Sequence, residues 1–416
     1  MQIKKLLLWL GSCVLILAIG IAGIMLYDLK APKERLQNDA TQITFWTVSE
    51  NYADYMRACA QSFNAYTDGE KIDLDVQVYS RSFIVDQINK SLLNDEQVPD
   101  LVDIRFTDMH QFVNSAEHSM FLYPLGSLFS EQDMPKATAL DAFSFNNTLL
   151  ALPYGLGEIV LFVNENVLCE QEINVESIQN WDDFFALGEK LGKNGISLLA
   201  MDVNNWDLLL AMMLQKDPDA ANLTDLNSVL RSEAFVEVYD RLKKAIHAGW
   251  ITIPEGLDIY NQRFYDDFQS GDYLCVAAPL EYAGEFIASM PALSGQVRIC
   301  PLPDMDTANN TPLVAQYGTA ILSRSKNIRL AKRFLGYARL GEAHYREMVD
   351  ALYVRSISSA ESETYHVPQA SAFLDYFGSN ALNALSPAQE RGYSAASALC
   401  EVVGTLAPEF LSLCAN

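Results

Sequence analysis

Segments with the spacing of strands and helices alternate near the start of the chain, and this alternation constrains the fold most strongly. Three segments have the length and apolar pattern of strands: QITFWTV (42–48), KIDLDVQVY (71–79) and VPDLVDI (98–104). Apolar residues at helical spacing separate them: Met56, Cys59, Ala60 and Phe63 first, then Val85, Ile88 and Leu92. The order strand, helix, strand, helix, strand predicts βαβ units, a parallel sheet and an α/β fold.

The carboxyl ends of these strands indicate where a ligand would bind. In open α/β sheets ligands lie beyond the carboxyl ends of the strands. Trp46 and Thr47 end the first strand, and Arg105 and Asp108 follow the third. We therefore expect these four residues near a crevice.

Length and charge narrow the class of protein further. The 416 residues exceed one average core, which favours two lobes, and 50% hydrophobic residues suffice to fill them. The net charge is −24, and no cluster of Lys and Arg stands out. Because nucleic-acid binding needs clustered cations, we expect no nucleic-acid partner.

The first 27 residues predict export and a membrane anchor. Lys4 and Lys5 precede 22 residues without charge, which as a helix would span roughly 33 Å, the thickness of a bilayer core. An uncleaved anchor is the first interpretation; a cleaved signal and a lipoprotein processed at Cys13 in LGSC stay open. Residues 28–41 are polar and lack periodicity, so they are expected to form a tether.

Later segments continue the alternation. NWDDFFALGEKLGKNG (180–195) has helix signals, with Asn180 as N-cap, acidic residues in the first turn and Gly195 as the stop. A second helix is expected from Phe235 to Gly249. Further strands and an amphipathic helix are predicted in four segments: YLCVAA (273–278), QVRICPLP (296–303), AQYGTAILS (315–323) and KNIRLAKRFLGYAR (326–339).

Eight motifs in this order resemble the extracellular solute-binding proteins of ABC importers, in particular the sugar-binding family that includes maltose-binding protein. They cover most of residues 42–358: ITFWT, VPDLVDI, LPYGLGEIVLFVNENVL, NWDDFFALGEKL, FQSGDYLCVAAP, VRICPLPD, YGTAILSRSKNIRLAKRFLGYA and ALYVRSIS. The chain departs from the family where YVRS lacks a proline before the basic residue.

The resemblance implies a two-lobed, periplasmic-binding-protein-like fold of type II, whose hinge the chain crosses three times. Lobe 1 would hold residues 42–153 and 280–340, and lobe 2 residues 154–279 and 341–416. The first crossover is expected within 151–166, where Pro153 and Gly155 set the bend. The second is expected near Ala278–Pro279 and the third between residues 339 and 344.

Sugar recognition needs flat apolar faces for the rings and polar groups for the hydroxyls. The crossover places Tyr154 and Glu158 at the cleft, and Trp206 stands in the polar loop DVNNWD. Tyr282 lies where relatives carry a stacking aromatic residue, and Tyr317 precedes a glycine. Each residue could instead serve packing or the surface. The candidate ligand-binding residues are Trp46, Arg105, Asp108, Tyr154, Glu158, Trp206, Tyr282, Tyr317 and Arg355.

Catalytic and metal motifs do not stand out. The five histidines form no HExxH or short-spaced pair, and no GxSxG elbow or Walker loop occurs. The seven cysteines form no CxxC, although a Cys400–Cys414 bridge stays open. We therefore expect no enzyme, no cofactor and no metal.

The expected function is the substrate-binding component of a bacterial ABC transporter on the extracytoplasmic face of the membrane. It would bind a sugar or oligosaccharide between the lobes and deliver it to the permease subunits. Two alternatives stay open: a solute-sensing receptor of a signalling system, and a binding protein for a polyamine or peptide.

Overall fold

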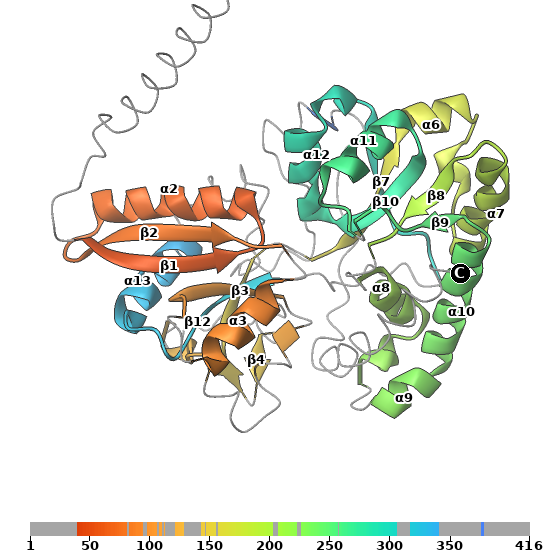
Figure 1. The fold of residues 1–416 in the computed structure, drawn as a ribbon. Coiled ribbons are helices and arrows are strands. Elements are labelled where there is room, and N and C mark those ends of the chain that lie inside the picture. The colour runs from red at the N-terminus through yellow and green to blue at the C-terminus, as the bar shows by residue number, and fades with distance from the viewer. Residues whose placement is uncertain are drawn as a thin grey trace, which may run out of the picture.

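The computed structural model describes most of the chain between residues 40 and 340, together with residues 376–377. Within that range it leaves out residues 81–82, 95–97, 106–107, 110–111, 113–120, 129–142, 146, 155–156, 203–206, 223–225, 257 and 306–316. The described elements form two α/β lobes that lie side by side (Figure 1). Nowhere in the described part does a helix combine the length and the apolar content of a membrane span. The anchor or signal expected at 1–27 and most of the tether at 28–41 lie outside the described residues.

The first lobe contains a five-stranded sheet in the order β2-β1-β3-β12-β6. Its strands are β1 Ala40–Thr47, β2 Lys71–Val78, β3 Leu101–Arg105, β6 Ala151–Tyr154 and β12 Tyr317–Ile321. β1 pairs in parallel with β2 and β3, which confirms the predicted parallel arrangement of the first three strands. β12 runs antiparallel between β3 and β6, so the complete sheet is mixed.

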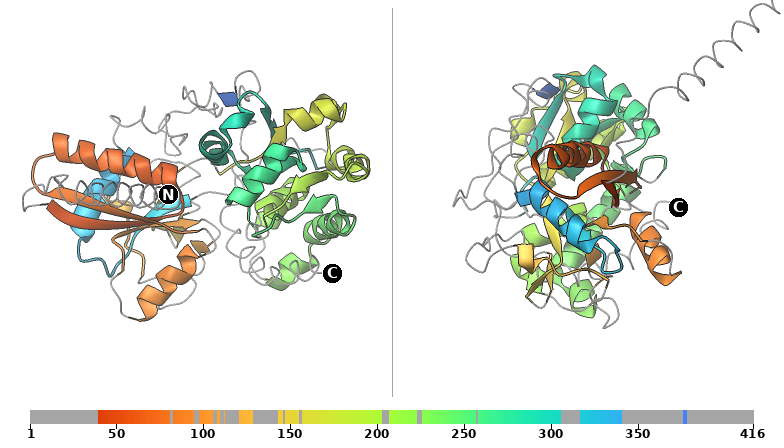
Figure 2. Two further views of the ribbon diagram at one scale, coloured as in Figure 1. Left: turned by 45° about the horizontal axis from the view of Figure 1, so that its top comes forward. Right: turned by 90° about the vertical axis from the view of Figure 1, so that its left-hand side faces the viewer.

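Three helices cover this sheet: α2 Glu50–Tyr66, α3 Ile84–Leu93 and α13 Ile328–Leu340. α2 begins after Ser49, whose hydroxyl accepts a hydrogen bond from the Tyr52 N–H, an ordinary N-cap. α2 and α13 pack side by side, with the Phe63 ring 5.8 Å from that of Phe334 (Figure 2). All four residues of the apolar face predicted for the first helix are buried.

The second lobe contains a sheet in the order β11-β7-β10-β8-β9. Its strands are β7 Ile159–Asn164, β8 Ser197–Ala200, β9 Ile251–Thr252, β10 Tyr273–Pro279 and β11 Val297–Pro301. Its helices are α6 Glu165–Glu170, α7 Trp181–Gly192, α8 Asp207–Lys216, α9 Leu226–Arg231, α10 Glu233–His247, α11 Gln262–Ser270 and α12 Ala283–Ser289. The Asn180 side chain accepts from the Asp183 N–H, as expected for the cap of α7.

Short elements complete the described fold. A two-stranded sheet joins β4 Ser144–Phe145 to β5 Thr148–Leu149. The 3-10 helices are η3 Gly126–Leu128, η4 Val175–Ser177, η5 Pro218–Asn222, η6 Leu280–Tyr282 and η7 Pro291–Leu293.

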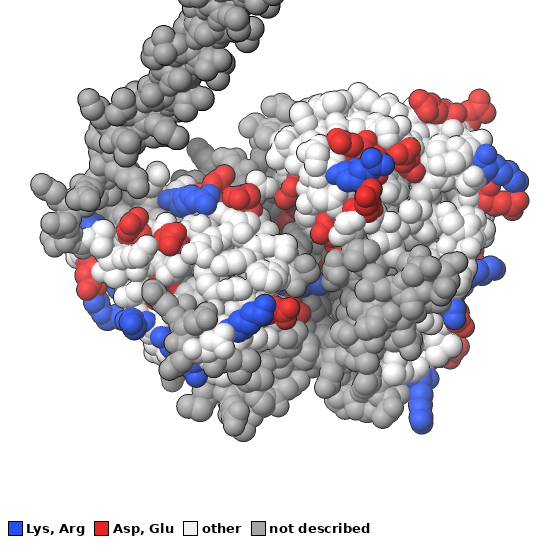
Figure 3. Space-filling view, viewed as in Figure 1, with Lys and Arg blue, Asp and Glu red and all other residues white. Residues whose placement is uncertain are grey.

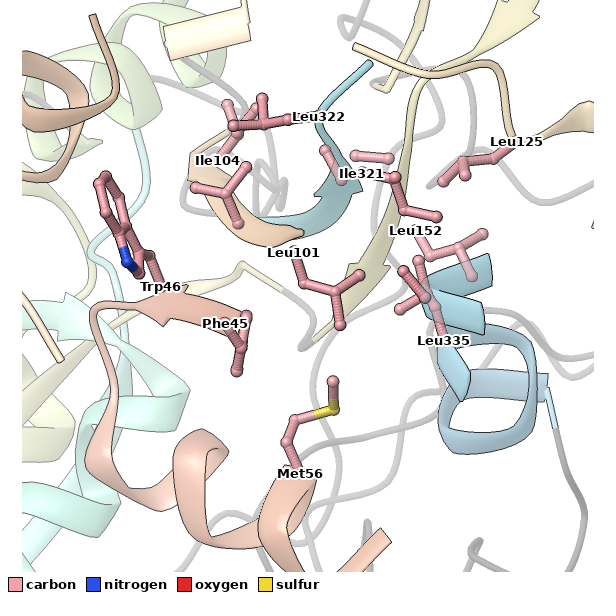
Figure 4. Close-up of a cluster of buried hydrophobic side chains, with 14 of the residues drawn as sticks. Phe45, Trp46, Met56, Leu101, Ile104, Leu125, Leu152, Ile321, Leu322 and Leu335 are labelled. Carbon is pink, nitrogen blue, oxygen red and sulfur yellow. The ribbon is translucent and has the colours of Figure 1, made fainter. Parts of the chain in front are cut away.

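The apolar cores of the two lobes are separate. One cluster lies around the first sheet, and Figure 4 shows Phe45, Met56, Leu101 and Leu335 within it. Successive residues of β7 alternate between two further clusters, with Leu161 in one and Phe162 in the other, because strand side chains point to opposite faces. Among the described residues, no apolar cluster contains residues of both lobes.

The structure changes one lobe boundary. The chain passes from β6 to β7 between residues 154 and 159, where the first crossover was expected. β10, however, is followed by α12 and β11, and β11 pairs antiparallel with β7 in the second sheet. The expected crossover near Ala278–Pro279 is therefore misplaced: the return to the first sheet lies between β11 and β12, and residues 280–301 belong to the second lobe.

A segment near the C-terminus reaches the second lobe. Tyr376 and Phe377 are buried in the same cluster as Phe286, and the Tyr376 hydroxyl donates to the Met290 carbonyl at 2.7 Å. The third crossover expected between 339 and 344 lies largely outside the described residues.

Candidate functional site

Strand ends converge at the edge of the first sheet that faces the second lobe. β1, β3 and β6 end there, and β12 begins there. Tyr317, the first residue of β12, stands in register with Arg105 at the end of β3 and with Tyr154 at the end of β6. Three of the residues expected from the sequence therefore lie next to one another on the same face of the sheet.

Tyrosine rings line up along this edge. The rings of Tyr52 and Tyr154 are stacked with centroids 3.8 Å apart, and the Tyr317 ring lies 6.0 Å beyond Tyr154. On the other side, Tyr55 lies 5.8 Å from Tyr52. Exposure rises along the row from 0% at Tyr52 to 8% at Tyr317, so Tyr317 stands at the outer end.

A buried carboxyl group, Asp103, anchors this row to three strands. Its Oδ2 accepts hydrogen bonds from the Thr47 hydroxyl of β1 and from the Tyr154 hydroxyl of β6, the latter at 3.0 Å. Its Oδ1 accepts from the Thr319 hydroxyl of β12 at 2.8 Å. The Tyr52 hydroxyl is 3.0 Å from the Thr319 hydroxyl, which extends the network to α2.

Arg339, in the last turn of α13, supplies the positive charge of this network. It is 2% exposed, and its Nη2 donates to the Pro153 carbonyl at 2.6 Å. Its guanidinium carbon lies 5.9 Å from the ring centroids of both Tyr52 and Tyr154, within cation–π range. Arg339 thus joins the end of α13 to the residue that precedes Tyr154.

Burial dominates the electrostatics here. Desolvation raises the pKa of Asp103 to about 7, against the opposing effects of its three hydroxyl donors and of the Arg339 charge. Desolvation also raises the pKa of the Tyr52 hydroxyl, so Tyr52 stays protonated at neutral pH. Asp103 is therefore a carboxyl group that can change charge near neutral pH.

Trp46 lies at the same edge but on the opposite face. In Figure 4 the side chains of Trp46 and Phe45 leave β1 on opposite sides. The Trp46 ring packs against Tyr79, with centroids 5.1 Å apart, and is 6% exposed. Its Nε1 is buried and has no hydrogen-bond partner among the described residues. The strand pleat thus separates Trp46 from Tyr154 and Tyr317, which the sequence had grouped with it.

An ion pair crosses from the first lobe to the second. The Arg105 guanidinium at the end of β3 contacts the Asp207 carboxylate, and their side chains are 14% and 4% exposed. Asp207 is the first residue of α8, where the positive end of the helix dipole favours a carboxylate. Residues 207–215 of α8 are all buried, so Asp207 stands on a helix fixed in the lobe-2 core.

The connection between β6 and β7 brings further polar groups to the boundary between the two lobes, which is called the seam below. Glu158 is 2% exposed, and its carbonyl accepts from the Leu280 N–H at 2.9 Å. The Gly157 N–H donates to the Glu281 carboxylate at 3.4 Å. Gly157 has φ +69°, a left-handed conformation that glycine adopts readily.

The remaining candidates do not join the row. Tyr282 is 1% exposed, contacts Phe286 and Tyr260 in the lobe-2 core, and donates its hydroxyl hydrogen to the Ile259 carbonyl. Asp108 lies beyond the end of β3 and is partly buried. Trp206 and Arg355 are outside the described residues.

Sequence reasoning missed three residues: Asp103, Asp207 and Arg339. Asp103 carried a signal, since it is a carboxylate within an otherwise apolar strand. Asp207 ends the DVNNWD segment, which was singled out for its polar groups beside Trp206, but Asp207 itself was not chosen. Arg339 looks like an ordinary helix-terminal charge, and its role depends on tertiary contacts. Across the described residues, no group of three or more His, Cys, Asp or Glu side chains could hold a metal ion.

Two α/β lobes with separate cores, joined by a crossing chain and an ion pair, define a two-lobed binding protein. On the face drawn in Figure 3 acidic and basic side chains of the described residues lie on both lobes. Residues 47–342 match the family described as bacterial extracellular solute-binding protein, and the chain belongs to this family.

Known proteins agree with this assignment. The chain is 25% identical over 382 residues to the arabinooligosaccharide-binding protein of Bacillus subtilis (strain 168), covering 90% of this chain and 85% of that protein. It is 24% identical over 311 residues to the arabinooligosaccharide-binding protein of Halalkalibacterium halodurans, covering 73% and 68%. Among solved structures, an ABC transporter-associated binding protein from B. animalis subsp. lactis Bl-04, in complex with β-1,6-galactobiose, shares the fold. The TM-score is 0.67 at 15% identity, over 90% of this chain and 97% of that one.

Proposed function

We propose that this protein is the receptor of a sugar ABC importer, binding an oligosaccharide between its lobes and presenting it to membrane permease subunits. The observation that carries the proposal is the juxtaposition of stacked tyrosines on lobe 1 with a carboxylate on lobe 2. Tyr154 and Tyr317 lie at the seam, and the Arg105 guanidinium contacts the Asp207 carboxylate across it. Aromatic faces and charged hydrogen-bonding groups are the two elements that sugar recognition needs.

The ligand class we propose is a short oligosaccharide, with arabinooligosaccharides as the first choice. The names of the two curated relatives support this choice. In the proposed site the Tyr317 ring, at the outer end of the row, stacks on a sugar ring. Tyr154, whose faces are covered by Tyr52 and Tyr317, contacts the sugar with its ring edge, whereas Arg105, Asp207 and Glu158 bind hydroxyl groups. Tyr282 would then support the lobe-2 core. Trp46, Asp108, Trp206 and Arg355 remain candidates at the margin.

Binding is proposed to work by closure of the lobes. A ligand that contacts both lobes favours the closed arrangement, because only that arrangement offers both sets of contacts. The crossover between Tyr154 and Ile159 and the return from β11 to β12 supply the hinge. The segment after residue 340 would complete lobe 2, consistent with the burial of Phe377.

The N-terminal segment is proposed to keep the receptor at the outer face of the cell membrane. Retention as a helix, or lipidation at Cys13, would hold the lobes within reach of a permease. The polar residues 28–41 would then act as the tether.

Calorimetric titration of the full chain tests the function. The chain is purified in a detergent without a sugar headgroup and titrated with arabinotriose, galactobiose, maltotriose, spermidine and a tripeptide. We expect saturable binding of at least one oligosaccharide and none of the amine or peptide. Binding of spermidine or the peptide alone, or of no compound, would overturn the sugar assignment.

A further inference from the structure

The buried network around Asp103 lies directly behind the proposed stacking surface. The Tyr154 ring lies between those of Tyr52 and Tyr317, and its hydroxyl donates to Asp103 at 3.0 Å. Asp103 is 0% exposed, so ligand cannot reach it, and any influence on binding must act through Tyr154. This inference rests on the proposed function.

We propose that Asp103 and Arg339 are positioning residues, which fix the Tyr154 ring for ligand when Asp103 is ionised and release it when Asp103 is protonated. The geometry that carries the proposal is the convergence of three hydroxyl donors on a single carboxyl group, with the Arg339 guanidinium bound to the backbone next to Tyr154.

The donor count explains why the ionised form fixes the ring. An ionised carboxylate only accepts hydrogen bonds, and here Thr47, Thr319 and Tyr154 supply three donors. Two of these donors, Thr47 and Tyr154, share Oδ2. Protonation removes the negative charge of the carboxyl group, so the hydrogen bonds that it accepts, including the one from Tyr154, lose their charge assistance and weaken.

Arg339 controls the same ring from the other side. Its guanidinium is 5.9 Å from the Tyr154 ring centroid and binds the Pro153 carbonyl, immediately before Tyr154. Its charge also favours the ionised form of Asp103.

The titratable and charged groups around Asp103 are Tyr52 from α2, Tyr154 from β6 and Arg339 from α13, together with the neutral hydroxyls of Thr47 and Thr319. Arg105 lies two residues further along β3 on the same face, and its charge is paired with Asp207. The raised pKa of Asp103, about 7, places its titration in a range where ordinary Asp and Glu side chains are already ionised.

The binding experiment measures the affinity of the full chain for arabinotriose between pH 5.5 and 8.5. We expect the wild-type affinity to fall at least about fivefold from high to low pH. Asp103→Asn should bind weakly and almost equally across this range. Asp54→Asn removes an exposed carboxylate on α2 and should keep the wild-type profile. Parallel profiles for wild type and Asp103→Asn would overturn the role in binding.

A second readout does not need ligand. ¹³C NMR of labelled Asp and Tyr follows the Asp103 carboxyl and the Tyr154 ring, assigned by their absence in Asp103→Asn and Tyr154→Phe. We expect both signals to move with one midpoint near neutral pH, and Arg339→Gln to raise that midpoint. A Tyr154 signal that stays constant while Asp103 titrates would overturn the proposed coupling between the two residues. Loss of all sugar binding with coupled signals would instead refute the proposed function and, with it, the role in binding.

Discussion

Asp103 is a carboxyl group without exposed surface, and its charge state affects the stability of the fold as well as its site. The folded chain keeps the Asp103 proton up to about pH 7, whereas an unfolded chain releases it near pH 4. In this window the folded state binds more protons, so the free energy of unfolding falls as pH rises. The ionised form that would position Tyr154 is therefore the less stable one.

We expect Asp103→Asn to remove this pH dependence. One pKa unit corresponds to about 1.4 kcal/mol, so relative to wild type the variant should gain roughly 4 kcal/mol in stability between pH 4 and pH 8. The NH₂ group of the new amide cannot accept a hydrogen bond, so hydroxyl donors lose a partner. This loss lowers the free energy of unfolding by about 1–3 kcal/mol at every pH. Urea unfolding at a series of pH values measures the free energy of unfolding of wild type and variant. An equal difference between the two proteins at pH 4 and pH 8 would contradict the raised pKa of Asp103.

Single residues were the hardest to predict from sequence, for physical reasons. Arg105 was expected at the crevice because strand ends share an edge, Tyr154 because of the crossover and Tyr317 because a glycine follows it. These three residues do lie at one edge of the sheet. Tyr282 was expected from the resemblance alone, but it lies in the lobe-2 core, where its hydroxyl donates to a carbonyl. Arg339 carried no signal, because burial of a charge depends on distant partners.

Helix α7 offers a comparison between two glycines on one element. A Cβ at Gly188 would lie 2.4 Å from the Trp250 ring, whereas a Cβ at Gly192 would meet nothing within 4 Å. Gly188 therefore allows α7 to pack against Trp250, and Gly192 has no such role.

We expect opposite effects when each glycine is replaced. Gly188→Ala should lower the free energy of unfolding by about 2–3 kcal/mol, because the indole must move in a packed core. Gly192→Ala should raise it by about 0.5 kcal/mol through helix propensity. Denaturant midpoints of the two variants measure these effects. A Gly188→Ala variant more stable than wild type would contradict the close packing of α7 against Trp250.

Elements were predicted better than residues because their signals are local. The apolar face of α2, the Asn180 cap and the strands β1 to β3 follow from spacing and capping alone. The assignment of β11 failed for a different reason. Its own pattern indicated a strand, but sheet membership depends on pairing with β7, more than 130 residues earlier, and no local signal records that pairing.

At the scale of the molecule, the described lobes have separate cores, and an ion pair crosses between them. The Arg105–Asp207 ion pair is partly shielded from water, so it is screened less than a surface pair. We expect it to favour the arrangement in which the lobes meet at this pair, without contributing to either core.

We expect charge changes at this pair to open the lobes. Asp207→Asn should increase the open population several-fold, and Arg105→Gln should do the same. The exchange Arg105→Asp with Asp207→Arg should restore closure in part, although the reversed charge opposes the α8 dipole. Spin labels are attached to noncanonical residues that replace Glu50 in lobe 1 and Lys244 in lobe 2. Pulsed electron paramagnetic resonance then measures the distribution of distances between the two labels. An unchanged distribution in both single variants would argue against a role in closure.

The most direct test of the whole account uses the same labelled pair in the otherwise unaltered chain, with and without saturating arabinotriose. If the two lobes close on a sugar at their seam, the Glu50–Lys244 distribution shifts to a single short distance as the sugar binds, and Tyr154→Ala together with Tyr317→Ala abolishes the shift. Saturable binding with an unchanged distribution, or an undiminished shift in the double variant, would contradict the account.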